Sequence, residues 1–330
     1  MTTIAFLGTS HIHAPDFFRR LKARDDLSTV LFWEADPERA KRTAHEWGFA
    51  PSTREAILSN PEVAGVIICS ETRLHEELVT ASAQAGKHMF VEKPLGMGAR
   101  DSRIMQQEIL KAGVLFQTGF FMRNQAVQRR VHDLLEAEAF GTVTRARLSN
   151  CHSGSLAGWF DSEWRWMADP AAAGVGAFGD LGYHILDLLQ WHLGPAAAGT
   201  ALLSTVTGRY GDCDETGEAL LRMRSGVIAT LAAGWVDRHD PVTLHITGTE
   251  GHALIRDGKL YVHSGPLGLS PDLAQALTEP DLPHPFEQFL DALSAPGNSP
   301  ALLSPVEAAE TSVVMEGLYH AARTRTWVDF

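Results

Sequence analysis

Three polar side chains near the middle of the chain are spaced so that one face of a helix would carry them all. Asp180 and His184 are four residues apart and Asp187 follows three residues later, so on a helix these positions form one stripe. An imidazole titrates near neutral pH and can take up and release a proton during a reaction. The stripe continues into apolar residues, so a packed, hydrogen-bonded histidine is the alternative interpretation of His184.

A second candidate is the charged pair Glu92-Lys93. The pair stands directly after the apolar run His88–Val91 and directly before Pro94. Two charged side chains are a poor choice for packing at the end of a buried strand. They therefore indicate a functional site at this edge of the predicted sheet.

The turn from Gly8 to His13 follows the first apolar strand and precedes a helix. A dinucleotide-binding fold holds the pyrophosphate with backbone amides at such a helix N-terminus. Against the pattern G-x-G-x-x-G only Gly8 is kept, because Ser10 and His13 stand at the other two glycine positions. Glu34 strengthens the assignment, since an acid at the end of the second strand accepts from both ribose hydroxyls and repels a 2′-phosphate. NAD is therefore favoured over NADP.

Strands and helices alternate through the first third of the chain. Short apolar strands are predicted at Thr3–Leu7, Thr29–Trp33, Val63–Cys69, His88–Val91 and Val114–Gly119. Helices are predicted at Ala14–Arg24, after Asp36, at Leu74–Ala85 and at Ala99–Ala112. This pattern predicts an α/β fold, a doubly wound parallel sheet of the Rossmann type, which we place at residues 1–120.

After Arg123 the strands alternate between apolar and polar residues. A longer helix at Gln125–Glu138 leads into the alternating segment Thr142–Leu148. Further strands are predicted at Ala201–Val206, Glu218–Met223, Val227–Ala232, Thr243–Thr247, Ala253–Arg256 and Lys259–His263. We infer an α+β domain over residues 121–330, built on an antiparallel sheet with one covered face. Its last helix, over about residues 305–322, is a candidate to pack back on the first domain.

Composition excludes several classes of protein. The 330 residues carry a formal net charge of −12 without a run of Lys or Arg, so no nucleic-acid partner is expected. No apolar run approaches the ~20 residues of a membrane-spanning helix, and the first residues do not form an export signal. The cysteines Cys69, Cys151 and Cys213 are far apart and lack CxxC spacing, which argues against disulfides and a thiolate zinc site. We expect a cytoplasmic enzyme without membrane contact.

Residues 85–95, AGKHMFVEKPL, resemble the AGKHVxxEKPL signature of the Gfo/Idh/MocA oxidoreductases almost residue for residue. Further matches are residues 36–40, His75, and Gly119 with Arg123. Later in the chain, WR at 164–165, AGVG at 173–176 and DLGYHILD at 180–187 resemble the WR, AGGG and DxGxHxxD elements of that family, in the same order. The chain departs from the family pattern at Ser10, His13 and Val175.

The resemblance implies a role for each catalytic candidate. Lys93 would lie beside the nicotinamide ribose and the reacting hydroxyl, His184 would take the hydroxyl proton, and Asp180 would orient the substrate or the imidazole. Hydride leaves carbon most readily while the hydroxyl loses its proton, and a cationic lysine stabilises the developing alkoxide. The expected reaction is reversible oxidation of a secondary alcohol on a sugar, cyclitol or related polyol, with NAD as the cofactor.

Cofactor and substrate contacts complete the predicted site. The candidate cofactor-binding residues are Gly8, Thr9, Ser10, His11, Ile12, Glu34, Ser70, His75, Glu92 and Lys93. The candidate substrate-binding residues are Arg123, His152, Trp164, Arg165, Asp180 and His184. The resemblance also implies an open, mainly antiparallel second sheet, with substrate on one face and a homodimer or homotetramer formed through the other.

Three alternatives stand beside this interpretation. An enzyme that retains NAD could cleave or isomerise a glycosidic substrate without net oxidation. A ligand-sensing protein could use the same fold, although the loss of Lys93 or His184 expected of it is absent. His11, His13 and His152 could converge on zinc, but no third ligand has a defined spacing, so no metal is predicted.

Overall fold

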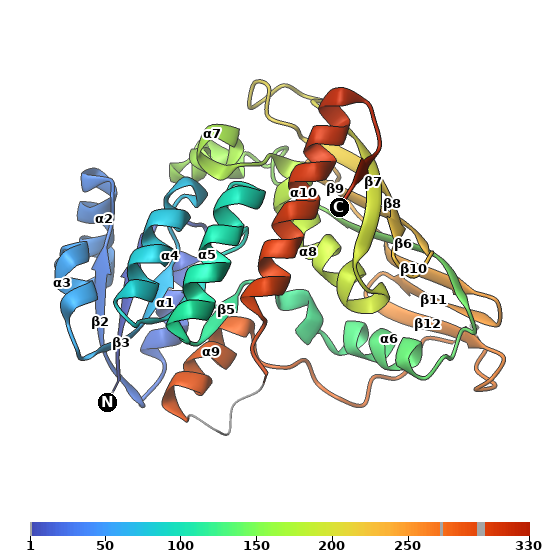
Figure 1. Ribbon diagram of the computed structural model, residues 1–330, viewed down its shortest axis with the longest axis horizontal. Helices are drawn as coiled ribbons and strands as arrows, with labels where there is room; N and C mark the ends of the chain where they lie inside the picture. Colours follow the sequence, from blue (N-terminus) through green and yellow to red (C-terminus); the bar gives the residue numbers. More distant parts are fainter. Residues whose placement is uncertain (1, 271–272, 296–300) are drawn as a thin grey trace. The chain divides into compact units, whose positions relative to one another are not determined.

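The computed structural model describes residues 2–270, 273–295 and 301–330. The chain forms two compact units (Figure 1). The first comprises residues 1–119, 161–174 and 283–312, and the second comprises residues 120–160, 175–282 and 313–330. Residues 161–174 and 283–312, which lie within the predicted second domain, group with the first unit in this division.

The first unit contains a five-stranded parallel sheet in the order β2-β1-β3-β4-β5. The strands are β1 Thr2–Leu7, β2 Leu27–Trp33, β3 Val63–Ile68, β4 His88–Val91 and β5 Phe116–Thr118. The helices are α1 Ala14–Lys22, α2 Pro37–Trp47, α3 Arg54–Ser59, α4 His75–Gln84, α5 Ala99–Ala112, α7 Pro170–Ala173 and α9 Pro285–Ser294, with short 3₁₀ turns η1 Thr72–Leu74 and η4 Glu163–Ala168. The strand order reverses between β1 and β3, so the ends of these two strands form the switch point where such folds bind ligands. The predicted Rossmann fold is confirmed.

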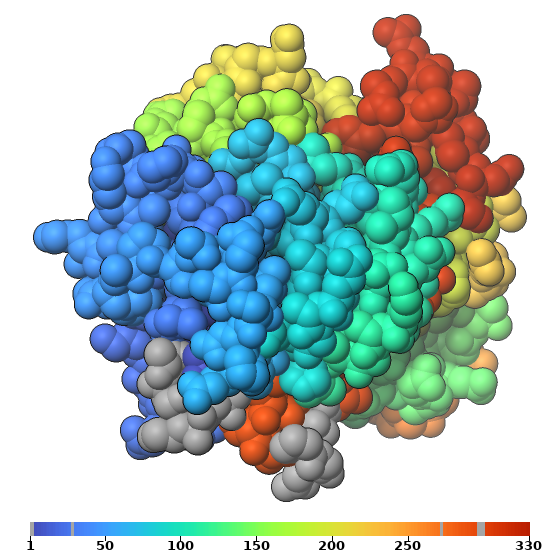
Figure 2. Space-filling model, turned by 60° about the vertical axis from the view of Figure 1, so that its left-hand side comes forward, coloured from blue at the N-terminus to red at the C-terminus, as the bar shows by residue number. Residues whose placement is uncertain are grey.

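Both faces of this sheet are covered, which explains the nearly continuous apolar strands. Ile4 and Phe6 point into one core, where the rings of Phe17 and Phe286 stack with centroids 4.4 Å apart. Ala5 and Leu7 point into the opposite core, formed with α4 and α5. Figure 2 shows the outer surface of α3, α4 and α5 as a continuous region running from blue to teal.

The second unit contains an eight-stranded sheet in the order β12-β11-β10-β6-β9-β8-β7-β13. The strands are β6 Val143–Cys151, β7 Ala196–Ser204, β8 Thr216–Met223, β9 Ile228–Gly234, β10 Val242–Gly248, β11 Gly251–Arg256, β12 Lys259–Ser264 and β13 Val328–Asp329. Only the pair β6 and β9 is parallel, so the sheet is mainly antiparallel, as predicted. The 3₁₀ turns η2 Phe121–Asn124 and η3 Trp159–Asp161 and the helices α6 Ala126–Glu136 and α8 Ala177–Leu193 precede or follow its strands.

The two faces of the second sheet differ in polarity. Alternate residues such as Leu148, Leu231 and Ile246 are buried, and α8 lies against this face, where Leu231 packs beside Gly182. The other residues of each strand point to the opposite, more exposed face. This alternation is what the sequence pattern predicts for a half-covered antiparallel sheet.

The last helix, α10 Pro305–Thr324, belongs to both units. Its first part, through Ser312, is in the first unit, where Ala308 and Ala309 join the core. The remainder belongs to the second unit. Within the described residues, no helix is both long enough and apolar enough to span a membrane.

Candidate active site

The turn after β1 has the backbone geometry of a phosphate-binding loop. Gly8 has φ +88°, and a Cβ there would lie 2.5 Å from the Cα of Ser70, so only glycine fits this close approach to the end of β3. Among the described residues, the amides of Ser10 and Ile12 form no hydrogen bond. With the positive end of α1 they form a donor set that suits a pyrophosphate.

Glu34 follows β2 and its carboxylate is buried. One oxygen accepts from the amide and the hydroxyl of Thr9, at 2.7 and 3.0 Å. The other accepts from the amide of Asp36 and the guanidinium of Arg39, both at 3.0 Å. A carboxylate has about four acceptor sites, so a ribose hydroxyl reaches Glu34 only by displacing one of these donors.

Removing this carboxylate is expected to change cofactor preference. In Glu34→Ala, NAD binding should weaken by roughly tenfold if the carboxylate accepts charged hydrogen bonds from the ribose, as the sequence predicts. NADP should lose less affinity, since the charge that repels a 2′-phosphate is gone and Arg39 loses its pairing with Glu34. Titration of both dinucleotides by fluorescence measures the ratio, with Glu38→Ala, an exposed acid paired to Lys41, as the control. An equal loss for NAD and NADP would contradict the assigned role.

Glu92 and Lys93 follow β4, at the same edge of the sheet. Glu92 is 1% exposed; it accepts from the amide of Lys93 and from Nδ1 of His13, both at 2.9 Å. A Cβ at Gly119 would lie 2.8 Å from this carboxylate, which explains the glycine after β5. Burial alone would raise the pKa of Glu92, but His11, His13 and Lys93 together hold it well below its usual range. The carboxylate is therefore ionised at neutral pH.

His75 fixes the segment that follows Lys93. Its Nδ1 donates to the carbonyl oxygens of Pro94 and Leu95, each at 3.1 Å. Burial lowers the pKa of His75, so the ring is neutral and carries its proton on Nδ1. The predicted cofactor ligand thus also holds the loop that carries the lysine.

Helix α8 carries the predicted catalytic stripe, and each member has a partner within the second unit. Asp180 accepts from the indole of the buried Trp235 at 3.1 Å. His184 is buried, with its ring centroid 5.0 Å from that of Phe121. Asp187 forms a bidentate pair with Arg123 at 2.6 and 2.8 Å. Both Phe121 and Arg123 belong to η2, so η2 packs beside the His184 and Asp187 part of the stripe.

The first turn of α8 is anchored by two residues that sequence reasoning missed. The hydroxyl of Tyr319 accepts from the amides of Gly176 and Gly179, both at 3.0 Å, and donates to Asp214 at 2.9 Å. Asp214 also accepts from the amide of Phe178 at 2.7 Å. Burial raises the pKa of Asp214, although these hydrogen bonds oppose the shift. Three amides that a helix start leaves unpaired are thereby satisfied.

Tyr319→Phe tests this anchor. The variant leaves two amides without their acceptor and removes one donor from Asp214, so we expect a loss of about 1–3 kcal/mol in the free energy of unfolding. Denaturant titration measures the loss. Tyr261→Phe removes a hydroxyl from β12 and serves as the control, for which the free energy of unfolding should stay close to wild type. Equal stability of the two variants would show that the anchor contributes little.

The remaining substrate candidates lie in two different segments. His152 belongs to the second unit; its amide donates to Gly234 and its ring lies 4.8 Å from that of Trp159. Trp164 and Arg165 lie on η4 of the first unit, where the exposed Arg165 donates to Ala168. Their neighbour Trp166, which the sequence analysis did not select, donates from its indole to the carbonyl of Ser10 at 2.9 Å. This contact places η4 against the phosphate turn.

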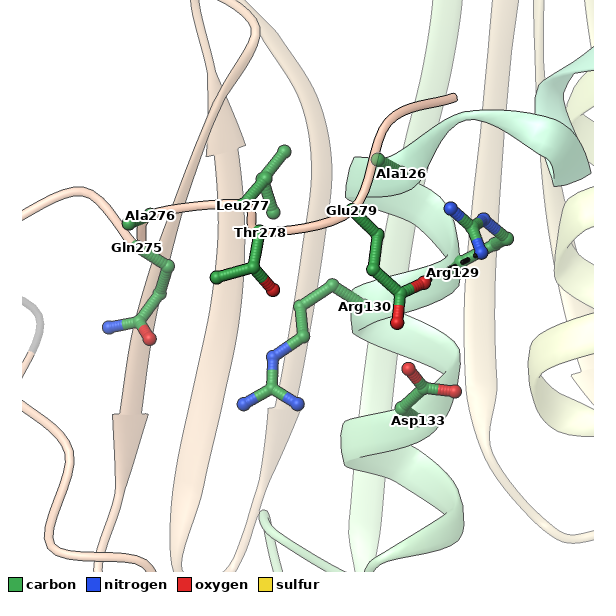
Figure 3. Close-up of a pocket in the computed structure, with 9 residues that line it drawn as sticks. All are labelled: Ala126, Arg129, Arg130, Asp133, Gln275, Ala276, Leu277, Thr278 and Glu279. Carbon is green, nitrogen blue, oxygen red and sulfur yellow. Dashed lines mark hydrogen bonds and ion pairs between the residues drawn. The ribbon is translucent and has the colours of Figure 1, made fainter. Parts of the chain in front are cut away.

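Two cavities of the second unit contain none of the predicted site residues. One, of about 320 Å³, lies between α6 and residues 275–279 (Figure 3), where Arg129 pairs with Glu279 at 3.0 Å. The other, of about 410 Å³, is lined in part by Asn150 of β6 and Ile185 of α8. The candidate chemistry therefore does not coincide with either cavity.

The switch-point turn, the acid after β2 and the charged pair after β4 define a dinucleotide-binding oxidoreductase. Residues 2–120 match the family model described as oxidoreductase family, NAD-binding Rossmann fold, and residues 128–254 match the model of the GFO/IDH/MocA C-terminal domain. This chain belongs to the Gfo/Idh/MocA oxidoreductase family.

Individual relatives share this organisation. Levoglucosan dehydrogenase of Pseudarthrobacter phenanthrenivorans is 28% identical over 276 residues, covering 74% of this chain and 70% of that protein. Myo-inositol 2-dehydrogenase of Thermotoga maritima is 29% identical over 239 residues, covering 68% of this chain and 64% of that protein. The solved structure of a levoglucosan dehydrogenase in complex with NADH and L-sorbose superposes with a TM-score of 0.82 at 22% identity, covering 100% of this chain and 98% of that one. At that identity the superposition establishes the fold.

Proposed function

We propose that this protein transfers a hydride between NAD and a secondary alcohol or ketone of a sugar, cyclitol or related polyol. Its relatives include enzymes named as dehydrogenases of levoglucosan and myo-inositol and a reductase of 1,5-anhydro-D-fructose. The observation that carries the proposal is helix α8, which holds the buried imidazole of His184 one turn beyond an Asp180 oriented by Trp235. Such a helix presents a base and a hydrogen-bonding carboxylate in fixed positions.

In the proposed mechanism each side chain has one task. NAD, when bound, accepts the hydride from the carbinol carbon or returns it. His184 takes the proton of the reacting hydroxyl, so that the oxygen is left with the electron pair that forms the carbonyl. Lys93 places its ammonium beside this oxygen and stabilises the negative charge that develops. Asp180 orients the substrate or the imidazole.

The proposed cofactor contacts follow from the free donors of the first unit. The amides of Ser10 and Ile12 bind the pyrophosphate. Glu34 accepts a hydrogen bond from a ribose hydroxyl, which replaces one of its present donors, such as Thr9 or Arg39. Ser70 abuts Gly8, and His75 holds the segment after Lys93, so both shape the dinucleotide site. NAD is the expected cofactor and NADP the weaker one.

For substrate binding we propose His152, Trp164, Arg165, Asp180 and His184, with Arg123 acting through its pair with Asp187.

We also propose a cytoplasmic homodimer or homotetramer. The exposed face of the second sheet carries Leu202, which is 77% exposed, and Ile228, which is 51% exposed. Exposed apolar side chains on an open sheet face favour self-association.

An absorbance assay at 340 nm tests the function. The purified protein is incubated with NAD or NADP and a panel of inositols, aldoses, anhydrosugars and uronates, after a check for co-purified dinucleotide. NADH formation with one polyol establishes the dehydrogenase and identifies the substrate. Silence with tightly held NAD would favour the redox-neutral enzyme, and silence without dinucleotide binding would favour the ligand-sensing protein.

A further inference from the structure

Three side chains at the end of the first sheet are grouped like the ligands of a metal ion. His11, His13 and Glu92 each offer one ligand atom, and the three atoms lie within 4.8 Å of one another. Two come from the turn before α1 and the third follows β4, 79 residues further on. No third ligand stands near these histidines in the sequence, so no metal was expected there, and the fold brings Glu92 to them.

The distances are close to those of a coordination site. Ligands of a tetrahedral zinc ion with bonds of about 2.0–2.1 Å lie roughly 3.3 Å apart. Oε1 of Glu92 is 2.9 Å from Nδ1 of His13 and 4.0 Å from Nδ1 of His11. One distance is shorter and the other longer than the separation expected between zinc ligands. Glu92 and His11 are almost fully buried, whereas the His13 side chain is 42% exposed. Two ligands are therefore fixed, and the third can turn to close the site.

The ring nitrogens are suited to bind a cation. Nδ1 of His11 accepts a hydrogen bond from the amide of His13 at 3.2 Å, so this nitrogen acts as an acceptor in the structure. Nδ1 of His13 faces the Glu92 carboxylate, and its proton is the one a metal ion would displace. On the other side, Trp166 packs with its ring 6.0 Å from that of His11.

We propose that His11, His13 and Glu92 bind one divalent transition-metal ion through two imidazole nitrogens and one carboxylate oxygen. Two histidines and one carboxylate form the ligand set of many Zn²⁺ and Fe²⁺ sites and leave positions open for water or a further ligand. The positive charge of Lys93, which acts on Glu92, opposes binding of the ion, so the three ligands must offset this repulsion. The ion would compensate the negative charge of the buried Glu92 carboxylate. This inference goes beyond the proposed hydride transfer and does not depend on it.

Metal binding is measured on the full chain, expressed without a polyhistidine tag. Protein stripped with a chelator is titrated with Zn²⁺ by calorimetry and with Co²⁺ by visible absorption. The variants are His13→Gln and Glu92→Gln, and His239→Gln is the matched control, since His239 forms an exposed pair with Asp257 at 3.2 Å. Circular dichroism and thermal melting establish that each variant is folded, and His13→Gln alters only a half-exposed side chain.

We expect one Zn²⁺ per chain, with affinity reduced by roughly tenfold or more in both ligand variants and unchanged in His239→Gln. Co²⁺ should give the visible spectrum of a four- or five-coordinate site in wild type and lose it in both ligand variants. The proposal is overturned if wild type shows no saturable 1:1 binding, or if either folded ligand variant binds as tightly as wild type. Binding is read without NAD or substrate, so failure here leaves the proposed hydride transfer to its own test.

Discussion

His184→Ala is expected to slow hydride transfer by about 10²- to 10⁴-fold, the usual effect of removing a general base. In the oxidation direction the hydroxyl proton then has no acceptor while the hydride leaves. Single-turnover formation of NADH, followed by absorbance after mixing enzyme, NAD and substrate, measures this step. NAD affinity should change little, since the proposed dinucleotide contacts lie in the first unit.

A control on the same helix separates chemistry from packing. His192 lies eight residues further along α8, is buried, and is 3.3 Å from the Gln128 side chain; burial lowers its pKa to about 3. His192→Gln should therefore keep most of the activity. A general base must be neutral to act, so wild-type oxidation should fall at low pH, and His184→Ala should lack that limb of the profile. Turnover of His184→Ala within about threefold of the control would remove His184 from the mechanism.

Segments whose apolar runs are long or sharply bounded were predictable to the residue. Strand His88–Val91 and helix Ala99–Ala112 match their predicted bounds. The strand ends where its apolar run meets a charged pair, and the helix ends at Gly113, which caps it in the left-handed conformation. The short helix α3 was missed, although Thr53 caps it by accepting from the amide of Ala56. Six residues give too little periodicity for a helix to be recognised.

The parts of the site that escaped prediction depend on tertiary contacts. Trp166 reaches Ser10 across 156 positions, and Tyr319 reaches Gly176 across 143. No local spacing signals either contact, because each residue by itself resembles an ordinary core aromatic.

Arg123 shows the reverse case, in which a motif match identifies the residue and leaves its task open. The match marks it as a substrate ligand, while the structure pairs it with Asp187 through two hydrogen bonds. Bidentate pairs of this kind fix geometry strongly. Arg123 therefore ties η2 to α8, where His184 contacts Phe121. Its proposed influence on substrate passes through the position of this helix.

The other large effect is expected for Lys93→Ala, which should lower the rate of hydride transfer by about 10²- to 10³-fold. The ammonium is proposed to stabilise the alkoxide, and removal of one such donor has effects of this size. The fold at this position should persist, because the hydrogen bond to Glu92 comes from the Lys93 backbone amide and remains in the variant. Lys111→Ala, which removes a lysine that is 79% exposed, is the control.

Two further measurements decide whether Lys93 acts on the reacting oxygen. Substrate deuterated at the reacting carbon should give a larger isotope effect in Lys93→Ala than in wild type, because hydride transfer becomes the slow step. Small primary amines added to the variant should restore part of the rate, since they return a cation to the space the side chain leaves. If instead only NAD affinity fell and the single-turnover rate at saturating NAD matched wild type, Lys93 would be a cofactor ligand alone. In that case His184 after proton uptake, or the substrate position set by Asp180, would have to stabilise the charge on the reacting oxygen. The proposed division of tasks would then be wrong.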